Sequence, residues 1–74
     1  MDLYRTYIVK IYGEDRAKVD DILMRHTSDI DSIRISAQKN DDDHSEVTYW
    51  IRPYIYEDYE TILNEFKEAG IQTF

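Results

Sequence analysis

The chain has 74 residues, of which 42% are hydrophobic and 14% aromatic, so it can form one small domain and is too apolar to be disordered. Its 16 acidic and 9 basic residues give a formal net charge of −7, which disfavours binding to nucleic acid and to anionic membrane surfaces. The chain contains no cysteine, which excludes disulfides and thiolate metal sites. No apolar run approaches the ~20 residues of a membrane span, so we expect no membrane insertion.

The first half of the chain predicts a strand and then a helix. Residues 3–12 are rich in Tyr, Ile and Val and carry bulky side chains on both faces, which is typical of a strand inside a sheet. Gly13 ends this strand. Residues 14–26 then change to helical spacing, with an apolar stripe that begins at Val19 and ends at His26.

The second half predicts two strands, a helix and a final short strand. Residues 32–38 alternate cleanly, a polar turn follows over residues 39–45, and residues 46–53 form the next strand. Within residues 54–69, an apolar stripe from Tyr59 to Phe66 predicts a helix, and Gly70 stands where a glycine ends one. Residues 71–74 complete the pattern as a strand, so we expect one domain over residues 1–74, excised from a longer protein.

This order predicts an α+β, ferredoxin-like β-α-β-β-α-β sandwich, in which two helices cover one face of a four-stranded antiparallel sheet. The first and third strands should lie side by side at its centre. The predicted core is Tyr7, Val9, Ile11, Val19, Ile22, Leu23, Ile33, Ile35, Val47, Tyr49, Ile51, Tyr59, Ile62, Leu63 and Phe66.

The opposite side of the sheet, which we call the open face, should remain uncovered by the helices. It presents Tyr4, Thr6, Ile8, Lys10, Tyr12, Arg34, Ser36, Gln38, Thr48, Trp50 and Arg52. A patch centred on Ile8 and Trp50 combines aromatic, aliphatic and arginine side chains, which protein interfaces favour. We therefore predict an interaction face formed by Tyr4, Ile8, Tyr12, Arg34, Trp50 and Arg52, with another copy or another domain of the same protein as its partner.

Three other interpretations of the open face stay available. Its aromatic side chains could simply cover the sheet backbone, since single exposed apolar residues are common. The face could bind a small ligand. It could also stack single-stranded RNA, but the negative charge opposes this, and the third strand lacks the sequence signature of RNA-recognition domains.

The sequence contains no combination of residues typical of an enzyme. There is no cysteine nucleophile, no nucleophile elbow and no glycine-rich phosphate loop, so we expect a non-catalytic domain without a cofactor. The one ligand-rich cluster consists of Asp41, Asp42, Asp43 and His44, whose oxygen atoms could hold Mg²⁺ or Ca²⁺. Consecutive acids in a hairpin loop are more often solvated turn residues. His26, at the end of a helical stripe, is better explained as a core-edge or capping residue than as a metal ligand.

The whole chain resembles the ACT-like branch of ferredoxin-like domains and, more narrowly, the cytoplasmic C-terminal domain of MgtC/SapB-family membrane proteins. The matching features are the strand YRTYIVKIY (4–12), the helix segment VDDIL (19–23), the strand entry DIDSIRI (29–35) and the ending LNEFKEAGIQTF (63–74). The resemblance implies a regulatory module of a bacterial inner-membrane protein of magnesium homeostasis, facing the cytoplasm. The alternative that it implies is a small-ligand or divalent-cation sensor of ACT type. ACT sensors present a glycine-containing loop after the first strand, whereas here Gly13 is followed by Glu14 and Asp15.

Overall fold

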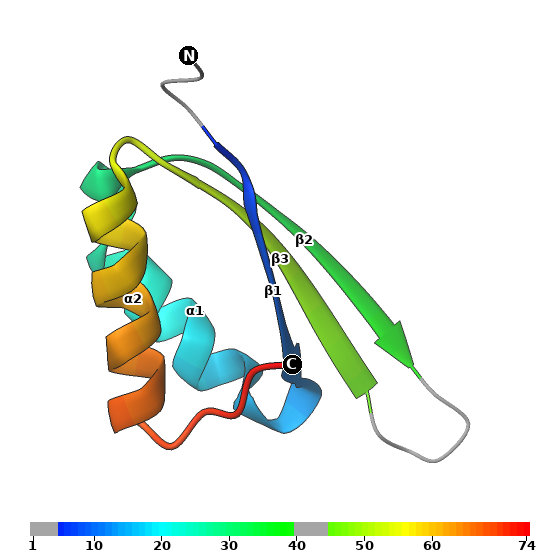
Figure 1. Cartoon of the computed structure of the whole chain (residues 1–74). Coiled ribbons are helices and arrows are strands. Elements are labelled where there is room, and N and C mark those ends of the chain that lie inside the picture. Colours follow the sequence, from blue (N-terminus) through cyan, green and yellow to red (C-terminus); the bar gives the residue numbers. More distant parts are fainter. Residues whose placement is uncertain (1–4, 40–44) are drawn as a thin grey trace.

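The structure is a computed structural model that describes residues 5–39 and 45–74. It contains strand β1 (Tyr7–Tyr12), helix α1 (Arg16–Arg25), strands β2 (Ile30–Lys39) and β3 (Ser45–Pro53), and helix α2 (Tyr56–Glu68). Short 3-10 turns over Gly13–Asp15 and Thr27–Asp29 flank α1. Both helices pack on one side of the sheet, and the paired strands β2 and β3 extend beyond the helices (Figure 1). The α+β class and the single helical layer are therefore confirmed.

The sheet has three antiparallel strands in the order β1-β3-β2. The first and third strands lie side by side, as predicted, but β1 stands at an edge of the sheet rather than at its centre. The expected fourth strand, residues 71–74, is reduced to a single bridge between Ile11 and Thr73. The physical reason is that the amide of Ile71 bonds to Phe66 O at the end of α2 and its side chain enters the core, so this residue does not pair with β1. The four-stranded topology is therefore not confirmed.

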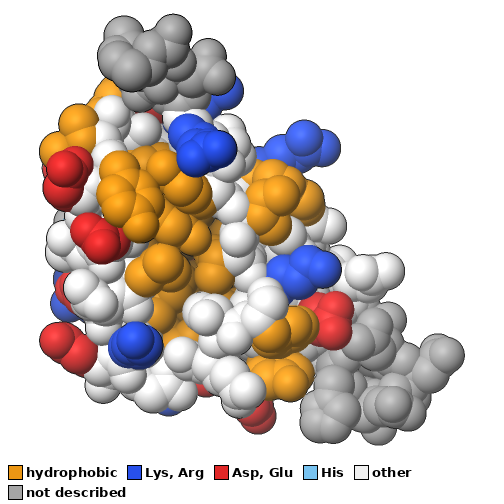
Figure 2. All heavy atoms as spheres, viewed as in Figure 1, with side chains coloured by type: hydrophobic (Ala, Val, Ile, Leu, Met, Phe, Trp, Pro, Cys, Tyr) orange, Lys and Arg blue, Asp and Glu red, His pale blue; other side chains and the backbone are white. Residues whose placement is uncertain are grey.

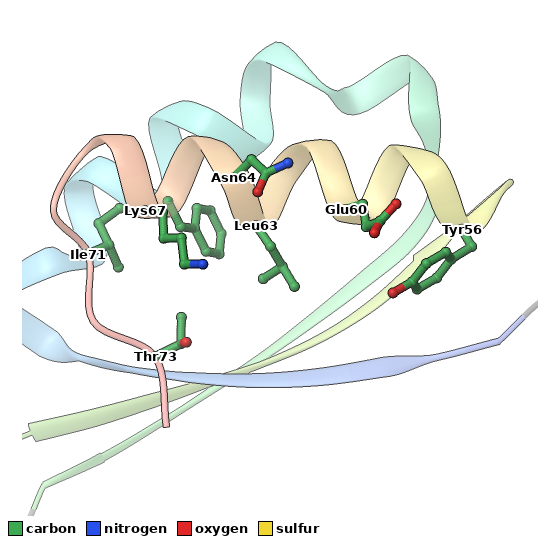
Figure 3. Close-up of a pocket in the computed structure, with 8 residues that line it drawn as sticks. Tyr56, Glu60, Leu63, Asn64, Lys67, Ile71 and Thr73 are labelled. Atoms are coloured by element: carbon green, nitrogen blue, oxygen red, sulfur yellow. The ribbon is translucent and has the colours of Figure 1, made fainter.

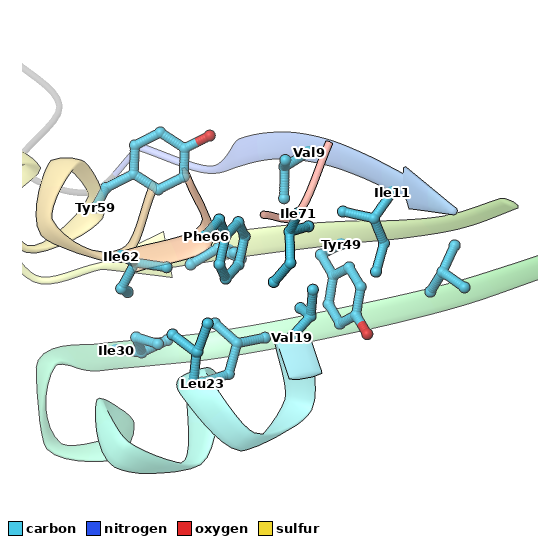
Figure 4. Close-up of a cluster of buried hydrophobic side chains, with 13 residues drawn as sticks. Val9, Ile11, Val19, Leu23, Ile30, Tyr49, Tyr59, Ile62, Phe66 and Ile71 are labelled. Carbon is cyan, nitrogen blue, oxygen red and sulfur yellow. The ribbon is translucent and has the colours of Figure 1, made fainter. Parts of the chain in front are cut away.

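The core lies between β1, β3 and the two helices (Figure 4). Most of the predicted core residues are buried, and Tyr7 and Leu63 pack against the core while staying partly exposed. Two residues missed by the prediction, Ile30 and Ile71, are 7% and 5% exposed. The prediction was wrong for Ile33 and Ile35, which are 38% and 43% exposed. They are on the strand farthest from β1, where the helical layer leaves a groove instead of close packing.

The hydroxyl group of Tyr49 links the sheet to α1. Tyr49 is fully buried in the middle of β3, and its Oη donates a 2.8 Å hydrogen bond to Asp20 Oδ1. Burial, and then the hydrogen bond to Asp20, raise the pKa of this phenol far above its usual value of 10.0. Without the carboxylate, the hydroxyl would be a buried donor without a partner, which costs about 1–3 kcal/mol. The bond therefore helps to fix α1 over the centre of the sheet.

Helix α2 ends in a Schellman motif. The amide of Gly70 donates to Lys67 O at 3.0 Å, and the amide of Ile71 donates to Phe66 O at 2.9 Å. Gly70 has a φ of +76°, a left-handed conformation that side chains with a Cβ disfavour. The motif turns Ile71 back into the core.

No helix in the described ranges, 5–39 and 45–74, has the length and apolarity that a membrane span requires. The longer of the two α-helices, α2, has 13 residues. Its exposed side carries several charged side chains, so its apolar stripe faces the sheet.

We predict that Gly70→Ala destabilises the domain by about 1–2 kcal/mol, because alanine is strained at this positive φ. The space around a Cβ at this position is open, so the loss comes from backbone conformation rather than from a clash. Urea unfolding monitored by circular dichroism measures the change. The matched control is Gly70→Asn, which should lose less stability than Gly70→Ala because asparagine tolerates the left-handed region. An alanine variant as stable as the wild type would contradict the assignment.

Candidate functional site

The centre of the open face is one row of three side chains across the sheet. The ladders place Trp50 of β3 directly opposite Ile8 of β1 on one side and Arg34 of β2 on the other. Because side chains alternate along a strand, all three point away from the helices. Ile8 is 60% exposed, and Trp50 is half-buried. The predicted grouping of these three residues is thus found in the structure.

Arg34 covers part of the indole of Trp50. Its guanidinium carbon lies 5.5 Å from the ring centroid, which is within the range of a cation–π interaction. Such a contact contributes about 0.5–1 kcal/mol at exposed sites and increases when water is removed. The pair therefore presents a flat, partly apolar surface with a positive charge at its rim.

Arg52 is two residues farther along β3 than Trp50, opposite Ser32. Its Nη1 atom lies 3.8 Å from Asp31 Oδ2, and both side chains are about 40% exposed, so the pair is solvent-screened and weak. Asp31 is the extra residue of a bulge in β2, which turns its carboxylate toward Arg52. Arg52 therefore belongs to the same surface as Trp50.

Tyr12 is at the other end of the open face, and its ring packs against Phe74. The two ring centroids are 4.7 Å apart, and the amide of Phe74 donates a 3.0 Å hydrogen bond to Lys10 O. Phe74 was missed by the sequence analysis. The available signal was its place in the short predicted strand 71–74, whereas the single bridge that brings this segment beside β1 has no local signal. Tyr4, the remaining predicted member, lies outside the described residues.

The open face is positive on an otherwise acidic chain. Its described cations are Lys10, Arg34 and Arg52, and no acidic side chain of the described residues forms an ion pair with Lys10. Glu46 stands at the hairpin end, opposite Tyr12 and Gln38. Most of the acidic side chains that give the chain its charge of −7 are instead on the helices and turns. An acidic partner surface would therefore meet favourable charge on this face.

A groove separates α2 from the outer edge of β1. It has a volume of about 280 Å³, and its lining combines apolar and polar side chains, which are Tyr56, Leu63, Phe66, Ile71, Glu60, Asn64, Lys67 and Thr73 (Figure 3). Apolar side chains gather on this side of the molecule between α2 and β1 (Figure 2). Here the ring of Tyr7 stacks on Tyr59 with centroids 4.3 Å apart. The groove follows the line along which the predicted fourth strand was expected.

His26, at the end of α1, joins the two helices. Its Nε2 atom hydrogen-bonds to Glu65 Oε2 of α2, and its Nδ1 atom lies 3.3 Å from Asp29 Oδ2. Arg25 Nη1 lies 3.8 Å from the other Glu65 oxygen. Burial alone would lower the pKa of His26, but the hydrogen bonds to Glu65 and Asp29 outweigh burial and raise the pKa above 6.5. The prediction of a core-edge role for His26 agrees with its 17% exposed side chain.

Within residues 5–39 and 45–74, no three His, Cys, Asp or Glu side chains come together as a group that could hold a metal ion. The predicted cation ligands Asp41, Asp42, Asp43 and His44 lie outside the described residues.

No protein-family model, curated protein or solved structure matches this chain. The resemblance to ACT-like domains and to the MgtC/SapB family, with the bacterial cytoplasmic location that it implies, therefore stays a prediction from the residue pattern.

We predict that the domain loses stability as the pH rises above about 6.5 through the pKa of His26 in the folded state. The folded-state pKa is raised, so the stabilisation is complete below the unfolded-state value and disappears when folded His26 loses its proton. Urea midpoints measured across this pH range test the expectation. The matched control, His26→Gln, should remove most of this pH dependence. A second variant, Glu65→Gln, should lower the pKa of His26 in an NMR titration, and His44→Gln serves to assign the two histidine signals. If the pKa of His26 is unchanged in Glu65→Gln, the hydrogen bond to Glu65 is not what raises it.

Proposed function

We propose that the protein is a non-catalytic interaction module that uses its open face to dock onto another domain of the same protein or onto another copy. The observation that supports this proposal is the row Ile8, Trp50 and Arg34 on a sheet face that the helices do not cover. An isoleucine that is 60% exposed directly beside a tryptophan forms a contiguous apolar patch, and such patches often mark interaction sites.

Burial of this row would stabilise a complex. Fully burying an isoleucine side chain contributes about 1.5–3 kcal/mol, and the Arg34–Trp50 contact would become stronger as water leaves. Tryptophan and arginine are also the residue types most enriched at the energetic centres of interfaces. Because all three residues are on paired strands, docking requires little ordering of the backbone.

Charge defines the chemistry of the partner. Lys10, Arg34 and Arg52 would pair with carboxylates, while Ile8 and Trp50 would contact an apolar side chain between them. Such a surface should associate faster at low ionic strength, because exposed charges are screened by salt. The same charges could contact phosphate, but the net charge of −7 opposes the approach of a nucleic acid.

The proposal predicts that a photo-cross-linking amino acid at Ile8 captures a defined partner in cells that produce the natural protein. We expect one predominant adduct, identified by mass spectrometry, because Ile8 is at the centre of the docking surface. The adduct should weaken in a Trp50→Ala variant whose circular dichroism is unchanged.

The matched control is the same cross-linker at Asp21, which is exposed on α1, away from the open face. If adducts from residue 8 are no stronger than those from residue 21, the open face is not a docking surface. A nucleic-acid adduct at residue 8 would also contradict the proposal.

A further inference from the structure

Strand β2 exposes apolar side chains on the side of the sheet that faces the helices. Ile33 and Ile35 are 38% and 43% exposed, and Met24 of α1 beside them is 75% exposed. Together with Asp20, Leu23 and Thr27 they line a groove of about 380 Å³, which we call the β2 groove. A second hollow of about 180 Å³ shares Thr27 and Ile33 with it and continues along β2 toward Ile30. The apolar surface therefore extends along most of the strand.

The same strand has a free edge. In the described sheet, β2 pairs with β3 from Ile30 to Lys39 and has no strand on its other side. Every second residue of such an edge directs its N–H and C=O groups outward, where they can pair with another strand. A strand added at this edge would extend the sheet and cover the β2 groove at the same time.

We propose that a second copy of this chain occupies the edge, with β2 pairing antiparallel to β2 of the second copy about a twofold axis at Ile35. The two three-stranded sheets would then form one continuous sheet of six strands. The proposal goes beyond docking on the open face and does not involve Ile8 or Trp50.

The sequence of β2 complements itself in this register. Ile35 meets Ile35 of the second copy, and Ile33 meets Ala37, so apolar residues face one another on the groove side. On the open face, Arg34 meets Ser36, and Ser32 meets Gln38. Shifting the axis to Arg34 would instead place two arginines directly opposite each other, which is unfavourable. A shift by one residue in one strand would turn the apolar residues of the two copies to different faces.

The order of residues along β2 supports a second copy as the occupant, because in this register apolar residues meet apolar residues and Arg34 meets a small polar residue, Ser36, rather than another arginine. A second copy also brings its own Met24, whose unbranched side chain adapts readily to an irregular apolar gap. Opposing this, two chains of charge −7 repel each other, so the dimer should become stronger as salt screens the repulsion. This is the opposite of the salt dependence expected for the open face.

Single cysteines test the register, because the natural chain contains none. Ile35→Cys places two thiols opposite each other across the proposed axis, where Cβ atoms of a strand pair come near disulfide distance. The matched control, Ser36→Cys, is also exposed on β2 but is opposite Arg34 and faces the other side of the sheet. We expect Ile35→Cys to form a disulfide dimer about tenfold faster than Ser36→Cys. Equal rates would overturn the register.

Sedimentation equilibrium of the wild-type chain tests the dimer itself. We expect a monomer–dimer equilibrium that shifts toward dimer with added salt, and we expect Ile35→Lys to be monomeric while remaining folded by circular dichroism. A wild-type chain that stays monomeric at its highest soluble concentration would overturn the proposal and would leave a strand from a different protein as the occupant. Ile35→Lys should leave the cross-linking from residue 8 intact, so failure here is distinct from failure of the open-face proposal.

Discussion

The alternation of side chains along β3 is the constraint on which the rest of the structure depends. β3 pairs with strands on both sides, and its residues Val47, Tyr49 and Ile51 are at most 1% exposed. Burying these three against the helices forces Trp50 and Arg52 to the opposite face, because consecutive side chains point in opposite directions. The hydroxyl of Tyr49 then needs a polar partner inside the core, and Asp20 supplies it from α1. One strand thus determines both the position of a helix and the composition of the open face.

Two short helices do not cover the whole sheet, and the two regions that they leave differ in chemistry. The open face combines Trp50 and Ile8 with cations, which suits an acidic and apolar partner. The edge of β2 combines free backbone groups with Ile33 and Ile35 in a self-complementary order, which suits a second copy. The two proposals are compatible, because pairing at β2 would place the open faces of both copies side by side on one larger sheet. A dimer could then present the docking row twice.

Local patterns in the sequence were sufficient to predict the helices, the hairpin and the grouping of the open face. The apolar stripe from Tyr59 to Phe66 predicted α2, and Gly70 predicted where it ends. Because alternate residues of a strand share a face, the spacing along the strands predicted that Ile8, Arg34 and Trp50 lie on the same side of the sheet. The alternation of side chains along a strand shows which residues share a face of the sheet. It does not show whether a helix covers that part of the face, so the exposure of Ile33 and Ile35 could not be predicted. The contact between His26 and Glu65 joins residues 39 positions apart and has no local signal. The short segment 71–74 has the residue pattern of a strand, but the amide of Ile71 bonds to Phe66 O in the motif that ends α2.

Amide hydrogen exchange, measured residue by residue over a wide range of protein concentration, tests most directly that β3 is the centre of the sheet and β2 an uncovered edge. We expect β3 amides to be protected at every concentration, since both neighbouring strands belong to the same chain. Alternate amides of β2 between residues 32 and 38 should exchange freely in dilute solution and become protected as the concentration rises. If these β2 amides exchange as slowly as those of β3 in dilute solution, the edge is already covered within the single chain, which would contradict an uncovered β2 edge.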